Sequence, residues 1–293
     1  MSKTPGSHPT HIEGMPPVER QVALTIAGFD PGSGAGITAD LKVFAANNMY
    51  GMAAITSLTV QSTQGVRRSE PVGAGLLRET LDCLADDVHF AGIKVGMLGS
   101  AENVEAVSSF LEAGGPSLPG RSRVVLDPVL RSSSGRELLE KAGIIFLQNR
   151  LISQVGWVTP NWEELSALIG RRIDSREAVL AGARELQAMA AAAGNPELNV
   201  VVTGGQLVPP DDYLLTANGA EYWLPGEHVA TSATHGTGCA FSTALLCGLM
   251  EGFPAYDAAA DAKAYVAMAL KTAYPIGRGK GPMHHLFRFT KGI

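Results

Sequence analysis

The sequence predicts an α/β protein with a central, mostly parallel β-sheet, helices on both of its faces and an antiparallel hairpin at one edge. Three observations lead to this fold class. A short apolar run, a glycine-rich loop and a helical pattern follow one another at residues 22–47. Strand-like apolar runs then alternate with apolar residues at helical spacing up to about residue 202. Two further strand-like runs, joined by Asn-Gly, follow at residues 213–224.

The composition limits the class of protein. The chain has 293 residues, 45% of them hydrophobic and 17% charged, which suits one large or two modest globular domains. A net charge of −5 gives no indication of a nucleic-acid surface. The three cysteines, at positions 83, 239 and 247, lack the spacing of a zinc site and are not an even set for disulfides, so we expect a reducing cytoplasm. We recognise no membrane-length apolar run and no signal peptide, so we expect no membrane partner.

One domain is expected. Residues 1–20 are rich in Pro, Gly, Ser and Thr, a composition typical of a disordered tail. Neither an internal repeat nor a low-complexity linker divides the rest of the sequence. We therefore expect a single domain over residues 21–291.

The first predicted unit is a strand, a glycine-rich loop and a helix, the usual opening of a βαβ unit. Its residues Gly34, Gly36 and Ala39 match the dinucleotide-binding fingerprint loosely. The acidic residue expected about 20 positions later is missing, and the sequence contains no P-loop motif. The unit therefore predicts neither a dinucleotide site nor a P-loop.

The strand expected at residues 52–60 ends in Gln61. A carboxamide at the carboxyl end of a parallel strand points into the crevice where α/β proteins bind ligands. Its donor and acceptor suit the edge of an aminopyrimidine ring, although a polar residue that caps a loop is the alternative. Asp40 is equally ambiguous, because a carboxylate in the first turn of a helix is also stabilised by the helix dipole.

Strands and helices alternate through the middle of the chain. Strands are expected at residues 92–97, 123–126, 155–158 and 198–202, and helices around residues 77–84, 104–111, 138–146 and 179–190. This alternation predicts a parallel sheet covered on both faces. The hairpin strands at 213–217 and 220–224 then precede helices at 240–250 and 255–273. The basic segment 277–285 either closes over a nucleotide or forms an ordinary surface loop.

Polar side chains follow several of the predicted strands. Asp127, Asn161, Glu164 and Thr203 would lie along the same sheet edge as Gln61. A carboxylate and an amide there could hold Mg²⁺ or its waters against phosphate oxygens. Taken singly, Asp127 before a proline is also compatible with a plain turn, and Glu164 with a charge at a helix start.

The segment 235–239, His-Gly-Thr-Gly-Cys, precedes an apolar helix. Two glycines before a helix allow a tight turn that directs free N–H groups outward, and together with the helix dipole these form a phosphate site. Cys239 would lie in the first turn, where the same field favours a thiolate. The alternative is a glycine turn before a core helix with a small buried cysteine.

At this point the sequence resembles the hydroxymethylpyrimidine/phosphomethylpyrimidine kinases of thiamin biosynthesis, which share the ribokinase-like fold with pyridoxal kinases. The resemblance covers nearly the whole predicted domain. It rests on the segments at 23–28, 30–31, 34–37, 39–42, 51, 55–56, 61–66, 94–98, 126–129, 159–161 with Glu164, 235–239 and 281–285.

The resemblance implies a three-layer α/β/α kinase that uses ATP with Mg²⁺. It would phosphorylate 4-amino-5-hydroxymethyl-2-methylpyrimidine and then its monophosphate to the diphosphate. The same resemblance implies a homodimer and allows a monovalent cation.

The resemblance also implies roles for single residues. Gln61 would bind the pyrimidine, Cys239 would act as the base, and the backbone from Gly236 to Gly238 would form an anion hole. Gly28, Met97 and Val129 would line the pyrimidine pocket, with Asp40 at the substrate side. Asn161 and Glu164 would contact the nucleotide and its metal, and Asp127 and Glu164 would bind the Mg²⁺ ion. Thr203, Gly205 and Thr237 would also lie on the ATP side.

The sequence departs from the family pattern at three places. Gly32-Ser33 reverses the usual order, and the segment 278–280 differs from the expected forms. Thr203 stands where many relatives have lysine, so a hydroxyl must serve there, or Arg278 or Lys280 must supply the cation. Pyridoxal kinase is the nearest rival function, and a nucleotide-dependent regulatory protein without turnover is a rival from another class.

Overall fold

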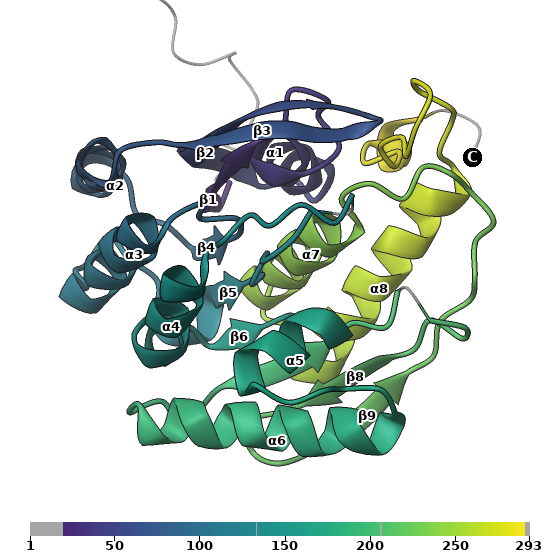
Figure 1. Ribbon diagram of the computed structural model, residues 1–293. Helices are drawn as coiled ribbons and strands as arrows, with labels where there is room; N and C mark the ends of the chain where they lie inside the picture. The colour runs from purple at the N-terminus through teal and green to yellow at the C-terminus, as the bar shows by residue number, and fades with distance from the viewer. Residues whose placement is uncertain (1–19, 133, 206, 291–293) are drawn as a thin grey trace, which may run out of the picture.

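The computed structural model describes residues 20–132, 134–205 and 207–290, which form a nine-stranded sheet with helices on both faces (Figure 1). The strands are β1 (Val22–Phe29), β2 (Tyr50–Ser62), β3 (Gly65–Pro71), β4 (Gly92–Val95), β5 (Val124–Leu126), β6 (Trp157–Val158), β7 (Asn199–Val202), β8 (Asp212–Leu215) and β9 (Glu221–Leu224). The α-helices are α1 (Gly36–Ala46), α2 (Ala74–Asp87), α3 (Ala101–Ala113), α4 (Lys141–Asn149), α5 (Trp162–Ile169), α6 (Arg176–Ala192), α7 (Thr237–Met250) and α8 (Ala255–Lys271). The tail expected at residues 1–20 lies outside the described residues except for Arg20, and the single domain over 21–291 stays a prediction.

The strand order is β3-β2-β1-β4-β5-β6-β7-β8-β9. Strands β2, β1, β4, β5, β6 and β7 pair in parallel, whereas β8 pairs antiparallel with β7 and β9 with β8. The predicted fold class is thus confirmed, including the antiparallel hairpin with Asn218 and Gly219 in its turn. Because the parallel strands end at one edge, the loops that follow them meet there.

A second antiparallel edge, β3 on β2, was not predicted. Its sequence, Gly-Val-Arg-Arg-Ser-Glu-Pro, is largely polar, and most of its residues are half-buried or exposed. A strand at the edge of a sheet needs little apolar surface, so hydrophobic periodicity gives no signal for it.

Two of the helix starts that differ from the predictions lie close to the site. Helix α4 begins at Lys141, because Leu138 belongs to the preceding loop and donates its amide to the carbonyl of Leu130. Helix α7 begins at Thr237 rather than Ala240, so its first turn already contains Gly238 and Cys239. The early start of α7 brings the glycine motif into the helix terminus itself.

The sheet separates two hydrophobic cores. Helices α2–α6 pack on one face, and α1, α7 and α8 pack on the other (Figure 1). Along β1, Leu24 and Ile26 belong to the first core while Ala23 belongs to the second, as the two-residue period of a strand requires. None of the helices within the described ranges is long and apolar enough to cross a membrane.

Two glycine turns lie at the sheet edge and touch each other. Gly36 has φ +58°, and a Cβ on it would stand 2.1 Å from the carbonyl oxygen of Gly28. Gly236 has φ +86°, and a Cβ on it would stand 1.8 Å from the carbonyl oxygen of Gly34. Only glycine fits at either position, so the starts of α1 and α7 are held together by backbone contact.

We predict that Gly36→Ala strongly destabilises the protein, because the new methyl group meets rigid backbone and the residue keeps a left-handed conformation. The free energy of unfolding should fall by roughly 2–4 kcal/mol. Urea denaturation of the purified variant measures this change.

Gly75→Ala is the matched control. Gly75 also lies near the start of a helix, but it is exposed and a Cβ there would meet nothing within 4 Å. This variant should gain about 0.5–1 kcal/mol from helix propensity. Equal stability for both variants would contradict the close backbone approach at Gly36.

Candidate active site

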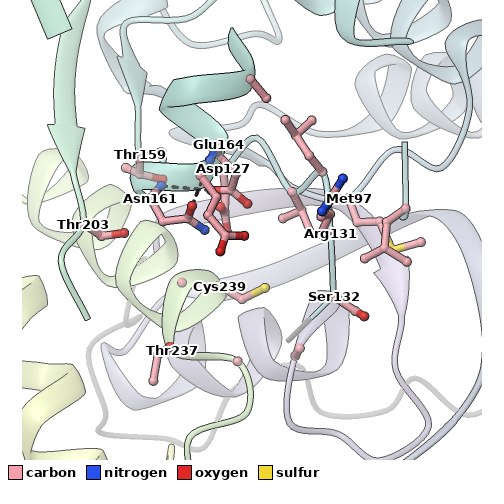
Figure 2. Close-up of a pocket in the computed structure, with 18 of the residues that line it drawn as sticks. Met97, Asp127, Arg131, Ser132, Thr159, Asn161, Glu164, Thr203, Thr237 and Cys239 are labelled. Carbon is pink, nitrogen blue, oxygen red and sulfur yellow. Dashed lines mark hydrogen bonds between the residues drawn. The ribbon is translucent and has the colours of Figure 1, made fainter. Parts of the chain in front are cut away.

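A cavity with a volume of about 790 Å³ lies where the parallel strands end (Figure 2). It is lined by residues near the ends of β1 and β2, by residues that follow β1, β4, β5, β6 and β7, and by the first turn of α7. Twelve of the residues singled out from the sequence line it: Gly28, Gln61, Met97, Asp127, Val129, Asn161, Glu164, Thr203, Gly236, Thr237, Gly238 and Cys239. Its size suits a small molecule together with the phosphates of a nucleotide.

Two other predicted site residues do not line this cavity. Gly205 is exposed and lies outside the set of lining residues. Asp40 is completely buried beneath the cavity. Its Oδ2 accepts hydrogen bonds from Thr25 (2.6 Å) and Lys94 (3.0 Å), and its Oδ1 accepts one from Thr243 (2.8 Å). Asp40 was expected at the substrate side, but its carboxylate is buried and accepts three hydrogen bonds from protein donors.

Lys94 is the cation beneath the site, and its side chain is fully buried. Burial disfavours the charged amine, but the charges of Asp40, Cys239 and Asp127 outweigh this effect and raise the pKa of Lys94. Gly96 makes room for the ammonium group, since a Cβ there would stand 2.6 Å from Nζ. Lys94 therefore remains positively charged directly under the groups that line the cavity.

Asp127 and Glu164 form an acidic pair in the cavity wall, across from Cys239 (Figure 2). Burial raises the pKa of Asp127, although Lys94 opposes this. Burial, reinforced by the nearby Asp127, raises the pKa of Glu164 to about 8. In the free protein the pair therefore retains a proton near neutral pH.

A capping box fixes Glu164 at the start of α5. Its Oε2 accepts the amide of Asn161 at 2.9 Å, and the side-chain oxygen of Asn161 accepts the amide of Glu164 at 2.9 Å. Within the described parts of the chain, no group of three or more His, Cys, Asp or Glu residues could hold a metal ion. The Asp127–Glu164 pair still fits Mg²⁺, which often binds one or two carboxylates and takes its other ligands from phosphates and water.

The first turn of α7 provides an anion site. Gly236 is the N-cap in a left-handed conformation, and no side chain caps the helix. The amides of Thr237 and Gly238 have no acceptor one turn earlier within the helix, and both residues line the cavity. The helix dipole adds positive potential at the same place.

Cys239 contradicts one prediction. Part of the residue remains accessible from the cavity. Burial nevertheless raises the pKa of its thiol to about 12, with Asp127 and Asp40 adding to the effect and Lys94 and the amide of Gly36 opposing it. The prediction that the helix terminus favours a thiolate is therefore wrong for the free protein, because desolvation and two buried carboxylates outweigh the dipole.

The sequence reasoning missed Asp30 and His235 as site residues. Both line the cavity, and Nε2 of His235 lies 2.8 Å from Oδ2 of Asp30 and 2.9 Å from the side-chain amide of Gln61. Both residues stand inside the glycine motifs already recognised, so their position next to those glycines was the available signal.

Neither Arg278 nor Lys280 lies at the cavity to replace the lysine that many relatives have at position 203. Thr203 lines the cavity, whereas Arg278 and Lys280 are not among its lining residues. The backbone amide of Arg278 instead donates to Oγ1 of Thr63, which holds this segment against the end of β2. Arg131 does line the cavity, on the side opposite Thr203 (Figure 2).

Comparison with known proteins agrees with this geometry. Residues 30–284 match the family described as phosphomethylpyrimidine kinase. A hydroxymethylpyrimidine/phosphomethylpyrimidine kinase from Rhizobium meliloti is 36% identical over 273 residues, which cover 92% of this chain and 98% of that protein. A thiamine biosynthesis bifunctional protein from Geobacter sulfurreducens is 35% identical over 271 residues, and the match spans 92% of this chain but only 53% of that longer protein.

Solved structures give the same result. The ADP complex of Bacillus subtilis pyridoxal kinase superposes with a TM-score of 0.79 and 28% identity, covering 91% of this chain and 98% of that one. A phosphomethylpyrimidine kinase from Clostridium difficile gives a TM-score of 0.73 and 29% identity, covering 86% of this chain and all of that one. The fold is ribokinase-like, as the resemblance implied, and the chain belongs to the phosphomethylpyrimidine kinase family.

Proposed function

We propose that the protein uses ATP to phosphorylate 4-amino-5-hydroxymethyl-2-methylpyrimidine and then its monophosphate, which yields the diphosphate needed for thiamin biosynthesis. One observation carries the proposal. A single cavity joins the amide of Gln61, which suits an aminopyrimidine edge, to the open first turn of α7, which suits a phosphoryl group. Family membership supports the same reaction.

In the proposed reaction the hydroxymethyl oxygen of the pyrimidine faces the γ-phosphate of ATP. Gln61 binds the ring, with Gly28, Met97 and Val129 around it. The amides of the first turn of α7 hold the charge that develops on the phosphoryl oxygens, and the loss of one such donor typically costs about 2.7–4 kcal/mol in barrier.

The nucleotide side of the cavity is assigned to the residues after β5, β6 and β7. Asp127 and Glu164 would hold Mg²⁺, which supplies positive charge against the phosphates. Asn161 fixes Glu164 through the capping box, and Thr203 offers a hydroxyl. Arg131 offers a cation from the opposite side of the cavity. Gly205 lies next to this region in the sequence but does not line the cavity. A monovalent cation beside the nucleotide stays a prediction.

Cys239 is assigned as the proton acceptor. Its thiol is protonated in the free protein because of burial and of the negative charges of Asp127 and Asp40. Neutralisation of Asp127 when the metal-bound nucleotide binds would remove part of that repulsion and leave the positive charge of Lys94 below. Positive charge held beside Asp127 would therefore lower the pKa of the Cys239 thiol and increase the share of thiolate that can act as the base.

Three further properties belong to the proposal. A homodimer follows from the resemblance, and sedimentation of the purified protein tests it. The requirement for ATP supports the cytoplasm as the location. Asp40 acts by holding Lys94 and α7 rather than by touching the substrate.

The first prediction concerns the reaction itself. With ATP and Mg²⁺, the pyrimidine should give a monophosphate and then a diphosphate, identified by product mass. The kcat/KM for the pyrimidine should exceed that for pyridoxal by at least about tenfold, since the two rings present different hydrogen-bonding edges. Turnover of pyridoxal alone would support the pyridoxal kinase alternative that the B. subtilis structure suggests. An absence of ATP consumption would support a regulatory protein instead.

The second prediction concerns the base. Cys239→Ala should lower kcat by roughly 10²–10⁴-fold, the usual contribution of general-base catalysis, with little change in KM for either substrate. Steady-state kinetics measures both constants. Cys83→Ala, which removes an exposed thiol on α2, is the control and should behave as wild type. Full turnover by the Cys239 variant would exclude the base role.

The third prediction uses the pKa of Glu164, which is about 8 in the folded protein and close to 4.5 in an unfolded chain. Between these two pKa values the folded protein keeps a proton that the unfolded chain releases. The stability that Glu164 contributes is therefore fully present below the unfolded pKa and is lost as pH rises through the folded pKa. Glu164→Gln removes this loss. Without nucleotide and metal, its Tm relative to wild type should rise by at least about 3 °C between pH 6 and pH 9.

Glu177→Gln is the control for this measurement. Glu177 is an exposed acid in the first turn of α6. Its Tm difference from wild type should be the same at both pH values. A constant difference for Glu164→Gln as well would show that the buried acid does not titrate in this range.

A further inference from the structure

The side-chain amide of Gln61 can present its donor and acceptor in two orders. A rotation of the amide by 180° exchanges oxygen and nitrogen with almost no change in shape. A substrate edge with an amino donor next to a ring-nitrogen acceptor pairs with one order, and the reversed edge of a 4-oxo pyrimidine pairs with the other. The pyrimidine cannot turn over to compensate, since its hydroxymethyl group must face the phosphoryl group in the function proposed above.

Asp30 provides a fixed acceptor near this amide. Its carboxylate accepts the backbone amides of Gly32 at 2.8 Å and of Gly34 and Ala35 at 3.0 Å each. Burial favours the neutral acid, but His235 and these amides keep the pKa of Asp30 below its ordinary value. Asp30 is therefore an ionised carboxylate, which can only accept hydrogen bonds.

This acceptor determines the protonation of His235. Nε2 of the imidazole lies 2.8 Å from Oδ2 of Asp30, so Nε2 must carry a hydrogen. Nε2 of Gln61 lies 2.9 Å from the same imidazole nitrogen. The single N–H of His235, shared between Asp30 and Gln61, cannot pair with an amide NH₂ group. The satisfied arrangement therefore exchanges the two amide atoms and turns Oε1 of Gln61 towards His235.

Thr59 completes the same arrangement at the other end of the amide. Its hydroxyl lies 2.9 Å from the carbonyl oxygen of Phe29 and donates its single hydrogen there. Oε1 of Gln61 lies 3.3 Å from the same hydroxyl oxygen. That oxygen has no second hydrogen to donate but can still accept one. An amide NH₂ group at this end is satisfied, whereas a carbonyl oxygen would face a hydroxyl without a free hydrogen.

The imidazole ring is held in place by its surroundings. A Cβ on Gly34 would stand 2.5 Å from Cδ2 of His235, so the glycine lets the ring lie against the first loop. The backbone amide of His235 donates to the carbonyl oxygen of Gly281 at 3.1 Å. The ring is therefore held between the loop at Gly34 and the segment at Gly281, so Asp30 and Gln61 contact a ring in a fixed position.

We propose that Asp30 and His235 are positioning residues that lock the Gln61 amide with Oε1 towards His235, and so select a 4-amino pyrimidine over its 4-oxo counterpart. The free lone pair of Oε1 then receives the amino group, and the free N–H of the amide donates to the ring nitrogen. This inference rests on the proposed function and adds the origin of its substrate selectivity.

Calorimetric titration without ATP tests the proposal. The probes are 4-amino-5-hydroxymethyl-2-methylpyrimidine and the analogue with a 4-oxo group and a hydrogen on the ring nitrogen. Wild type should bind the amino compound at least about 100-fold more tightly, because the wrong edge leaves polar groups unpaired. An unfolded fraction of a variant preparation lowers the stoichiometry of the titration and leaves both Kd values unchanged.

Three variants separate positioning from structural roles. His235→Leu removes the N–H that faces Gln61, and the Kd ratio should fall to within about tenfold because the amide can then turn. His235→Gln keeps a terminal NH₂ that can donate to both Asp30 and Gln61, and it should restore most of the discrimination. His284→Leu alters a neighbouring histidine outside this network and should leave the ratio at the wild-type value.

The outcomes are distinct. An unchanged ratio in His235→Leu overturns the proposal, as does a His235→Gln variant that discriminates no better than His235→Leu. Wild-type protein that binds the 4-oxo compound more tightly also overturns it. If wild type binds neither pyrimidine, the proposed function fails, and the positioning of Gln61 fails with it.

Discussion

The buried ion pair between Lys94 and Asp40 supports the whole site. Both side chains are fully buried, and Nζ and Oδ2 lie 3.0 Å apart. Thr25 and Thr243 donate to the same carboxylate, so the pair joins β1, β4, α1 and α7 in one hydrogen-bonded cluster. Removal of one partner from such a buried pair typically costs about 3–5 kcal/mol. The relative position of the two glycine turns above the pair therefore depends on it.

The cavity concentrates negative charge that the single buried cation does not balance. Asp127 and Glu164 both have raised pKa values, and so does the thiol of Cys239. The common cause is burial, reinforced by repulsion between neighbouring acids. In the proposed function these groups lie where Mg²⁺ would bring positive charge, and that charge would lower all three pKa values. Proton acceptance by the thiol would then depend on the bound metal.

Much of the fold and of the cavity lining was predictable because its signals are local. A polar residue directly after an apolar run lies at the edge of a parallel sheet wherever that strand is placed, which is why Gln61, Asp127 and Asn161 reach one cavity. Strand β3 was not predicted, because an exposed edge strand does not need alternating apolar residues. Asp40 was placed too close to the substrate because depth below a surface is not encoded in helical position.

The sequence by itself determined the alternation of strands and helices, the glycine turns and the identity of the residues at the strand ends. Each of these depends on steric limits and burial within a few consecutive residues. Only the tertiary structure decided the protonation of the site. The helix terminus at Cys239 favours a thiolate, but the burial and the nearby carboxylates that raise the pKa of its thiol exist only in the folded protein. Likewise His235 and Gln61 are 174 positions apart, and the orientation of that amide depends on an acceptor that folding alone brings within reach.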